Sequence, residues 1–370
     1  MEENKDYTRK IFSLLLFFAV ILFFALLKWT YAVSMPISVS ILIALLFYPL
    51  LSKMHKIHIP WVVSIIFVLL ITLIICGITG RLLSNSVQAI IASYPKYEDR
   101  FKSIYLFFVE TFNLDYDENV SLLNNLLGSE KIRTWLQSFA LSLSSNLFNT
   151  SKNLLMIFLL LLFLLLEVRS IKVKARTAFE ETNLSGKVPA MAIKIIRDIT
   201  QYVSIKFLAS LVTGVIVYLG LLVIHMDFPI IWGFLSFILN FIPTFGSIIS
   251  WIATTAFALL QYFPQWGYVV YVGILLLAVN QIIGNFIEPR IEGKGLGISP
   301  FIILVSLTLW GYIWGFIGMI VAIPFTVILK IIFENTEILK PVSIIIGNTR
   351  DLKNSQKKEN CEKEKETKEK

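Results

Sequence analysis

Residues 60–79 read PWVVSIIFVLLITLIICGIT and contain no charged side chain. About 20 consecutive apolar residues span the ~30 Å hydrocarbon core of a bilayer as a helix, so this stretch predicts a transmembrane helix. Comparable apolar blocks occur at 11–27, 36–51, 153–166, 207–224, 228–262, 265–284 and 300–333. Sustained β-barrel alternation is absent. The sequence therefore predicts an all-α, polytopic integral membrane protein with about eight membrane-embedded segments.

Charge distribution predicts the orientation of the chain. If the N-terminus is cytoplasmic, 25 of the 33 Lys and Arg residues fall in segments on the cytoplasmic side and 8 fall outside. Cytoplasmic loops of membrane proteins carry such an excess. The net charge of +8 is thus interpreted as a topology signal, with no nucleic-acid partner and both termini cytoplasmic. The first block is expected to be a retained span, because no small-residue cleavage site follows it.

Composition divides the chain into four expected regions. Residues 1–80 hold three spans, and residues 81–152 are more polar but keep apolar residues at helical spacing. That second region is expected to form amphipathic, extracytoplasmic helices, although a simple spacer is an alternative. Residues 153–340 contain the remaining spans, and residues 341–370 form a Lys/Glu-rich cytoplasmic tail.

Two apolar stretches are too long for one span. Residues 228–262 and 300–333 would each measure ~50 Å as a continuous helix. Both are interrupted by residues that break or bend helices, or that allow close packing: Asn240, Pro243 and Gly246 in the first, and Gly311, Gly315, Gly318 and Pro324 in the second. We expect two hairpin-like segments, which in transporters tend to lie at the substrate site. Ordinary helix packing and pairs of short full spans are the alternatives.

Polar residues cluster late in the span between these stretches. Gln281, Asn285 and Glu288 are spaced to share one helical face, whereas Asn280 lies about 100° from Gln281. Glu288 and Arg290 fall where the span reaches the cytoplasmic boundary. The amides either contact a solute or tie helices together. The two charges either line a gate or anchor the helix end.

Other chemistry finds no support in the sequence. The three histidines lack an HExxH pattern, and neither a GxxxxGK[ST] phosphate loop nor a GxSxG elbow is present. An intramembrane protease would need a catalytic pair at membrane depth, which the apolar blocks do not offer. We therefore expect no enzyme activity, no metal and no cofactor.

From 239 to 325 the sequence resembles the bacterial autoinducer-2 exporter (AI-2E) family of membrane proteins. The resemblance lies in NFIPTFGSII at 240–249, GNFIEPRIEGKGLGISPF at 284–301 and WGYIWGFIGMIVAIPF at 310–325. It implies a bacterial cell-membrane location, homo-oligomers, and export of autoinducer-2, sodium–proton antiport or a role in sporulation. The resemblance draws attention to Asn240, Pro243, Gly246, Asn285, Glu288, Pro289, Arg290, Gly293, Pro300, Trp310, Gly311, Gly318 and Pro324.

These observations lead to one main hypothesis and two alternatives. The main hypothesis is a secondary transporter that exports a small polar solute around the two broken segments. A sodium–proton antiporter is the first alternative, with Glu288 and Asp227 as the available carboxylates. The second is a non-transporting scaffold in which the amphipathic region and the tail recruit partners.

Overall fold

The structure is a computed structural model that describes residues 2–111, 154–167, 187–292, 297–336 and 339–347, with single positions at 170, 174 and 177. Every named element in this part of the chain is a helix, and the isolated bridge between Ile298 and Gly347 is its one β-type pairing. The all-α class is thus confirmed. Gly293, a predicted hinge, lies outside the described residues, as do residues 112–153 and the tail from 348.

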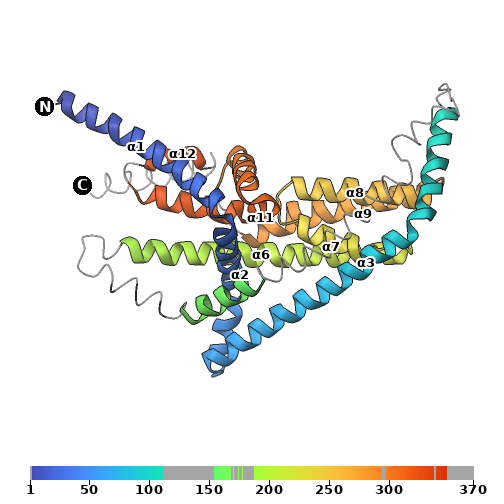
Figure 1. Cartoon of the computed structure of the whole chain (residues 1–370), viewed down its shortest axis with the longest axis horizontal. Coiled ribbons are helices and arrows are strands. Elements are labelled where there is room, and N and C mark those ends of the chain that lie inside the picture. Colours follow the sequence, from blue (N-terminus) through green and yellow to red (C-terminus); the bar gives the residue numbers. More distant parts are fainter. Residues whose placement is uncertain are drawn as a thin grey trace, which may run out of the picture. The chain divides into compact units, whose positions relative to one another are not determined.

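The helices follow one another with short connections through most of the described chain (Figure 1). Their bounds are α1 Glu2–Trp29, α2 Tyr31–Lys56, α3 Trp61–Thr111, α6 Lys187–Val223, α7 Pro229–Leu239, α8 Phe245–Tyr262, α9 Trp266–Asn280, η2 Gln281–Ile287, α10 Glu288–Glu292, α11 Pro300–Glu334 and α12 Lys340–Ile346.

Many of these helices have membrane-spanning length and composition. Six qualify among the described residues: Tyr31–Lys56, Trp61–Leu82, Val188–Val223, Phe245–Tyr262, Trp266–Ile291 and Pro300–Glu334. Shorter apolar helices occur at Phe18–Trp29, Leu154–Glu167 and Pro229–Leu239. The predicted polytopic architecture is therefore confirmed. The candidate span Trp61–Leu82 is the first part of α3, which is 51 residues long and continues without a break to Thr111.

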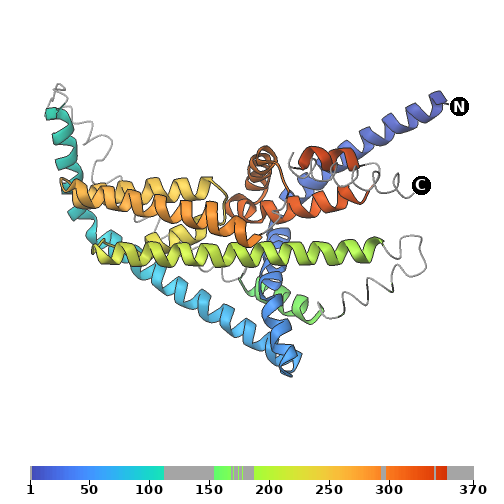
Figure 2. The ribbon, with the colours of Figure 1, turned by 180° about the vertical axis from the view of Figure 1, so that it is seen from behind.

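The chain divides into two compact units. One comprises Met1–Ser52, Met156–Val203 and Lys294–Lys370, and the other comprises Lys53–Leu155 and Ser204–Gly293. The core of the first unit gathers Tyr202, Ile323, Val327 and Ile331, among others. In the second unit, α8 packs against both α7 and α9 (Figure 2).

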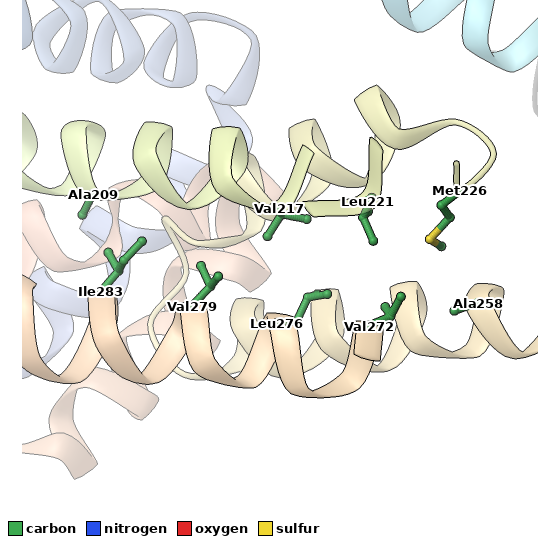
Figure 3. Close-up of a cluster of buried hydrophobic side chains, with 9 residues drawn as sticks. All are labelled: Ala209, Val217, Leu221, Met226, Ala258, Val272, Leu276, Val279 and Ile283. Atoms are coloured by element: carbon green, nitrogen blue, oxygen red, sulfur yellow. The ribbon is translucent and has the colours of Figure 1, made fainter. Parts of the chain in front are cut away.

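An apolar cluster holds α6 against α9 in the second unit. Figure 3 shows Ala209, Val217 and Leu221 of α6 opposite Val272, Leu276 and Val279 of α9 and Ile283 of η2. These side chains are spaced by eight and four residues on α6 and by three or four residues along α9 and η2, so each set forms one face. The cluster fixes the position of η2, which follows α9 directly.

The first long apolar stretch folds back on itself. α7 ends at Leu239 and α8 begins at Phe245, with a tight turn between them. The hydroxyls of Ser236 and Ser250 lie 2.7 Å apart and join the two helices. With 11 residues, α7 is ~16 Å long and too short to cross a bilayer alone. The predicted break is therefore confirmed as a helical hairpin, called the first hairpin below.

The second long stretch also folds back, within α11. Trp314 and Gly315 leave the helical conformation, and the φ of Gly315 is 62°, a region that favours glycine. The hydroxyls of Ser306 and Thr326 lie 2.5 Å apart. A straight helix would separate residues twenty positions apart by ~30 Å. This element, residues 300–334, is the second hairpin.

Candidate functional site

A buried polar face runs along the membrane-spanning part of α6. Lys206, Ser210 and Thr213 follow one another at spacings of four and three residues, which places them on one side of the helix. All three are buried. Val217 and Leu221 continue the same side as apolar residues of the cluster in Figure 3. This side of α6 is therefore mainly polar from Lys206 to Thr213 and apolar from Val217 to Leu221.

Lys206 pairs with Glu288 inside the second unit. The Nζ–Oε1 distance is 2.7 Å, and the side chains are 8% and 12% exposed. Both residues belong to helices apolar enough to span a membrane. Ionised groups in such segments are costly and usually lie at functional positions. Removing one partner of a buried pair leaves the other charge buried without a partner, which typically lowers the free energy of unfolding by about 3–5 kcal/mol.

The π-helix η2 brings Glu288 to this position. The backbone N–H of Glu288 donates to the carbonyl of Ile283, five residues earlier, instead of four. Pro289 follows and has no N–H of its own, so the regular helical ladder is already interrupted there. π-bulges are rare and occur frequently at functional sites. The wider turn directs Glu288 toward α6.

The predicted polar stripe is divided by this change of helix type. Asn285 donates a hydrogen bond to the side-chain carbonyl of Gln281, and both side chains are exposed. Glu288 instead faces inward to Lys206. The prediction that all three share one face is therefore wrong, because it assumed regular α-helical turns. Asn280 is half-buried just before η2, and Arg290 is exposed in α10.

The turn of the first hairpin meets the polar face of α6. The side-chain amide of Asn240 donates a 3.0 Å hydrogen bond to the hydroxyl of Ser210, and both residues are buried. One turn further along α6, the hydroxyl of Thr213 has no hydrogen-bond partner among the described residues. Buried polar atoms are usually paired, and the Thr213 hydroxyl is one of six buried side-chain atoms without a partner in the described part of the chain.

Backbone packing at this turn depends on Gly246. A Cβ added there would lie 1.7 Å from the carbonyl oxygen of Leu239, so only glycine fits. Pro243 lies in the turn and cannot extend a helix across it. A second close approach joins α6 and α7, where a Cβ on Gly233 would lie 2.8 Å from the carbonyl oxygen of Gly214.

The remaining predicted hinge and packing residues gather in the second hairpin, in the other unit. A Cβ on Gly318 would lie 1.8 Å from the carbonyl oxygen of Trp310, and one on Gly311 would lie 3.1 Å from Met319. The Trp310 ring stacks on Phe325 with a centroid distance of 4.4 Å. Pro300 lies in the first turn of α11, and Pro324 is buried within its second arm.

Asp227 belongs to a separate cluster near the ends of the first hairpin. Its carboxylate accepts hydrogen bonds from Lys96 at 2.7 Å and from the Tyr97 hydroxyl. Partial burial opposes ionisation of Asp227, but these two hydrogen bonds and the Lys96 charge outweigh it and lower the pKa of the carboxyl. Burial, the hydrogen bond to Asp227 and its charge raise the pKa of the Tyr97 phenol. Arg100 donates to the carbonyl of Phe263 at 3.1 Å.

Sequence reasoning missed Lys206, Ser210 and Thr213. Their spacing within an apolar span was an available signal, but the partners of Lys206 and Ser210 lie 82 and 30 positions away along the chain. Within the described residues, no group of three or more His, Cys, Asp or Glu side chains could hold a metal ion. The groups available to a ligand at the polar face are the hydroxyls of Ser210 and Thr213, the amide of Asn240 and the Lys206–Glu288 ion pair.

Comparison with known proteins adds independent evidence. A family model described as "AI-2E family transporter" matches residues 12–338. A protein of Borreliella burgdorferi named "Putative transport protein" is 32% identical over 269 residues, which cover 73% of this chain and 72% of the relative.

Two proteins of Escherichia coli strain K12 are also similar. The one named "Putative transport protein YhhT" is 34% identical over 224 residues, 60% of this chain and 62% of the relative. The one named "AI-2 transport protein TqsA" is 32% identical over 209 residues, 56% of this chain and 59% of the relative. This chain thus spans less than two thirds of either E. coli protein.

Proposed function

Because the chain belongs to the AI-2E family of transporters, we propose that it is a secondary transporter that exports a small polar solute, similar in chemistry to autoinducer-2. Family and relatives are named for transport, not for catalysis. The name of TqsA supports autoinducer-2 as the first solute to test. We place the chain in the bacterial cytoplasmic membrane with both termini inside, following its charge asymmetry.

The observation that carries the proposal is the unpartnered Thr213 hydroxyl beside the turn of the first hairpin. Thr213 is 2% exposed and lies one helical turn from the Ser210–Asn240 hydrogen bond. A hydroxyl-rich solute would supply the missing hydrogen bond, which a buried polar group needs. Broken helices place such groups at solute sites in many transporters.

Access to this face would require the turn of the first hairpin to move. One side-chain hydrogen bond, Asn240 to Ser210, joins the turn to the polar face, and such a bond contributes about 0.5–1.5 kcal/mol net. A solute that takes over the Ser210 hydroxyl would offset its loss. We propose that solute binding and release accompany displacement of residues 240–244 from α6.

Efflux from proteoliposomes tests the proposal. Vesicles containing the purified chain and loaded with autoinducer-2 are expected to lose it faster than vesicles without protein. Thr213→Val preserves side-chain shape and removes the hydroxyl, so it should slow efflux while leaving the protein folded. Efflux equal to that of protein-free vesicles would refute export of this solute.

The ion pair argues for solute export over sodium–proton antiport. Of the two carboxylates available to an antiporter, Glu288 is already paired with Lys206 and Asp227 with Lys96. Deletion of residues 351–370 distinguishes a transporter from a scaffold. A transporter should keep its efflux activity without the tail, whereas a scaffold that uses the tail would lose its partners.

A further inference from the structure

We propose that the Lys206 ammonium, by pairing with the Glu288 carboxylate, prevents small monovalent cations from binding there. The pair would thus restrict the transported solutes to uncharged polar molecules. This inference rests on the proposed transport function and concerns the selectivity of the same site. Its evidence is the geometry and charge balance of the α6 polar face.

The pair is placed where an external cation would otherwise bind. Glu288 is nearly buried, follows the π-helix, and points at α6. Its Oε1 lies 2.7 Å from the Lys206 ammonium, within the range of a charge-assisted hydrogen bond. The neighbouring groups on this face, Ser210 and Thr213, are neutral. The pair therefore balances its own charge without help from an ion.

A sodium ion could join Glu288 only against repulsion from the ammonium. Two unit charges about 4 Å apart in a partly buried site repel strongly enough to weaken binding roughly a thousandfold. Displacing Lys206 would leave its charge buried without a partner, which is also unfavourable. An uncharged solute faces neither penalty and needs only hydrogen-bond partners such as Thr213.

Removing the Lys206 charge should therefore create sodium sensitivity. The assay is the melting temperature of the purified full chain in detergent, in sodium chloride against choline chloride at equal ionic strength. The unaltered protein should melt at the same temperature in both salts. Lys206→Met keeps a long side chain but frees the carboxylate, so sodium should raise its melting temperature by about 3–4 °C at a hundredfold excess over the dissociation constant.

Two further variants give the experiment its controls. Lys194→Met removes a lysine from the same helix whose pair with Glu334 is exposed, and it should stay insensitive to sodium. Lys206→Met/Glu288→Gln lacks both buried charges and should fold without sodium sensitivity. If Lys206→Met does not fold unless sodium is present, while the double variant folds in either salt, the freed carboxylate is again the cause.

Contrary results are equally clear. Sodium-dependent stabilisation of the unaltered protein that disappears in the double variant would overturn the proposal and indicate antiport, especially if protons are released. A folded Lys206→Met that ignores sodium would overturn it as well. Failure of autoinducer-2 efflux would instead refute the transported solute without changing these melting temperatures, so the two proposals fail separately.

Discussion

Replacing Gly246 by alanine should open the turn of the first hairpin. In the structure a Cβ at this position would lie 1.7 Å from the carbonyl oxygen of Leu239. Real Cβ atoms essentially never approach closer than 3.0 Å, so the two chain segments must separate by about 1.3 Å. The obstructing atom belongs to the backbone, so no side-chain rotation can relieve the clash.

The magnitude follows from two opposing effects. Overpacking of a well-filled interior typically costs about 1–3 kcal/mol, and the upper end applies where backbone must move. Alanine is preferred over glycine within a helix by about 1 kcal/mol. Gly246→Ala should therefore lower the free energy of unfolding by about 2 kcal/mol. Gly77→Ala is the matched control: Gly77 lies in α3 with nothing within 4 Å of its Cβ position, so this change should be neutral or stabilising.

The free energy of unfolding of both variants can be measured in mixed detergent micelles, with circular dichroism as the probe of helix content. Solute efflux from proteoliposomes adds a functional comparison, because separation of the turn would also disturb the Asn240–Ser210 hydrogen bond. The reasoning is refuted if Gly246→Ala is as stable as Gly77→Ala. Equal stability would mean that the close approach at Leu239 does not exist in the folded protein.

Three more perturbations probe other parts of the structure. Asn240→Ala should cost about 1–3 kcal/mol of unfolding free energy, because it leaves the buried Ser210 hydroxyl unpaired; an equally stable variant in a denaturant titration would contradict this. Gly318→Ala should destabilise the second hairpin, since its Cβ would lie 1.8 Å from the Trp310 carbonyl oxygen, and limited proteolysis should then cleave the chain faster than it cleaves Gly77→Ala. The pKa of Asp227 lies below its ordinary value of 3.8, so the stabilisation that its charge provides is present above that pH and lost as the pH falls through the lowered pKa. The stability difference between the unaltered protein and Asp227→Asn should accordingly shrink as the pH falls below about 5, and a difference that grows would show the opposite shift.

Much of the architecture follows from local sequence patterns. Apolar block length predicts membrane helices, and Pro243, Gly246 and Gly315 mark the two places where a long helix must break. These are short-range properties, because chain stiffness and hydrophobic length are set within a few residues. The hairpins were therefore predictable from residues 228–262 and 300–333 alone.

The site was harder to predict because its contacts depend on distant residues and on one irregular turn. Glu288 stood out as a carboxylate at the cytoplasmic end of a predicted span, but nothing nearby in the sequence indicated Lys206 as its partner. The stripe prediction failed because η2 has wider turns than an α-helix, and only the hydrogen bond from Glu288 to Ile283 reveals this. Arg290, which neighbours Glu288 in sequence, is exposed and takes no part in the buried pair.

The α3 extension has a mechanical consequence for the first hairpin. One turn of this helix, from Lys96 to Arg100, holds Asp227 just before α7 and the Phe263 carbonyl just after α8. Both helices of the hairpin are thus bound to α3 at the end opposite the turn. These contacts oppose sliding of the hairpin along α3, and they lie at the end of the hairpin farthest from its turn. Any bending of the hairpin should therefore move residues 240–244 most, where Asn240 contacts Ser210.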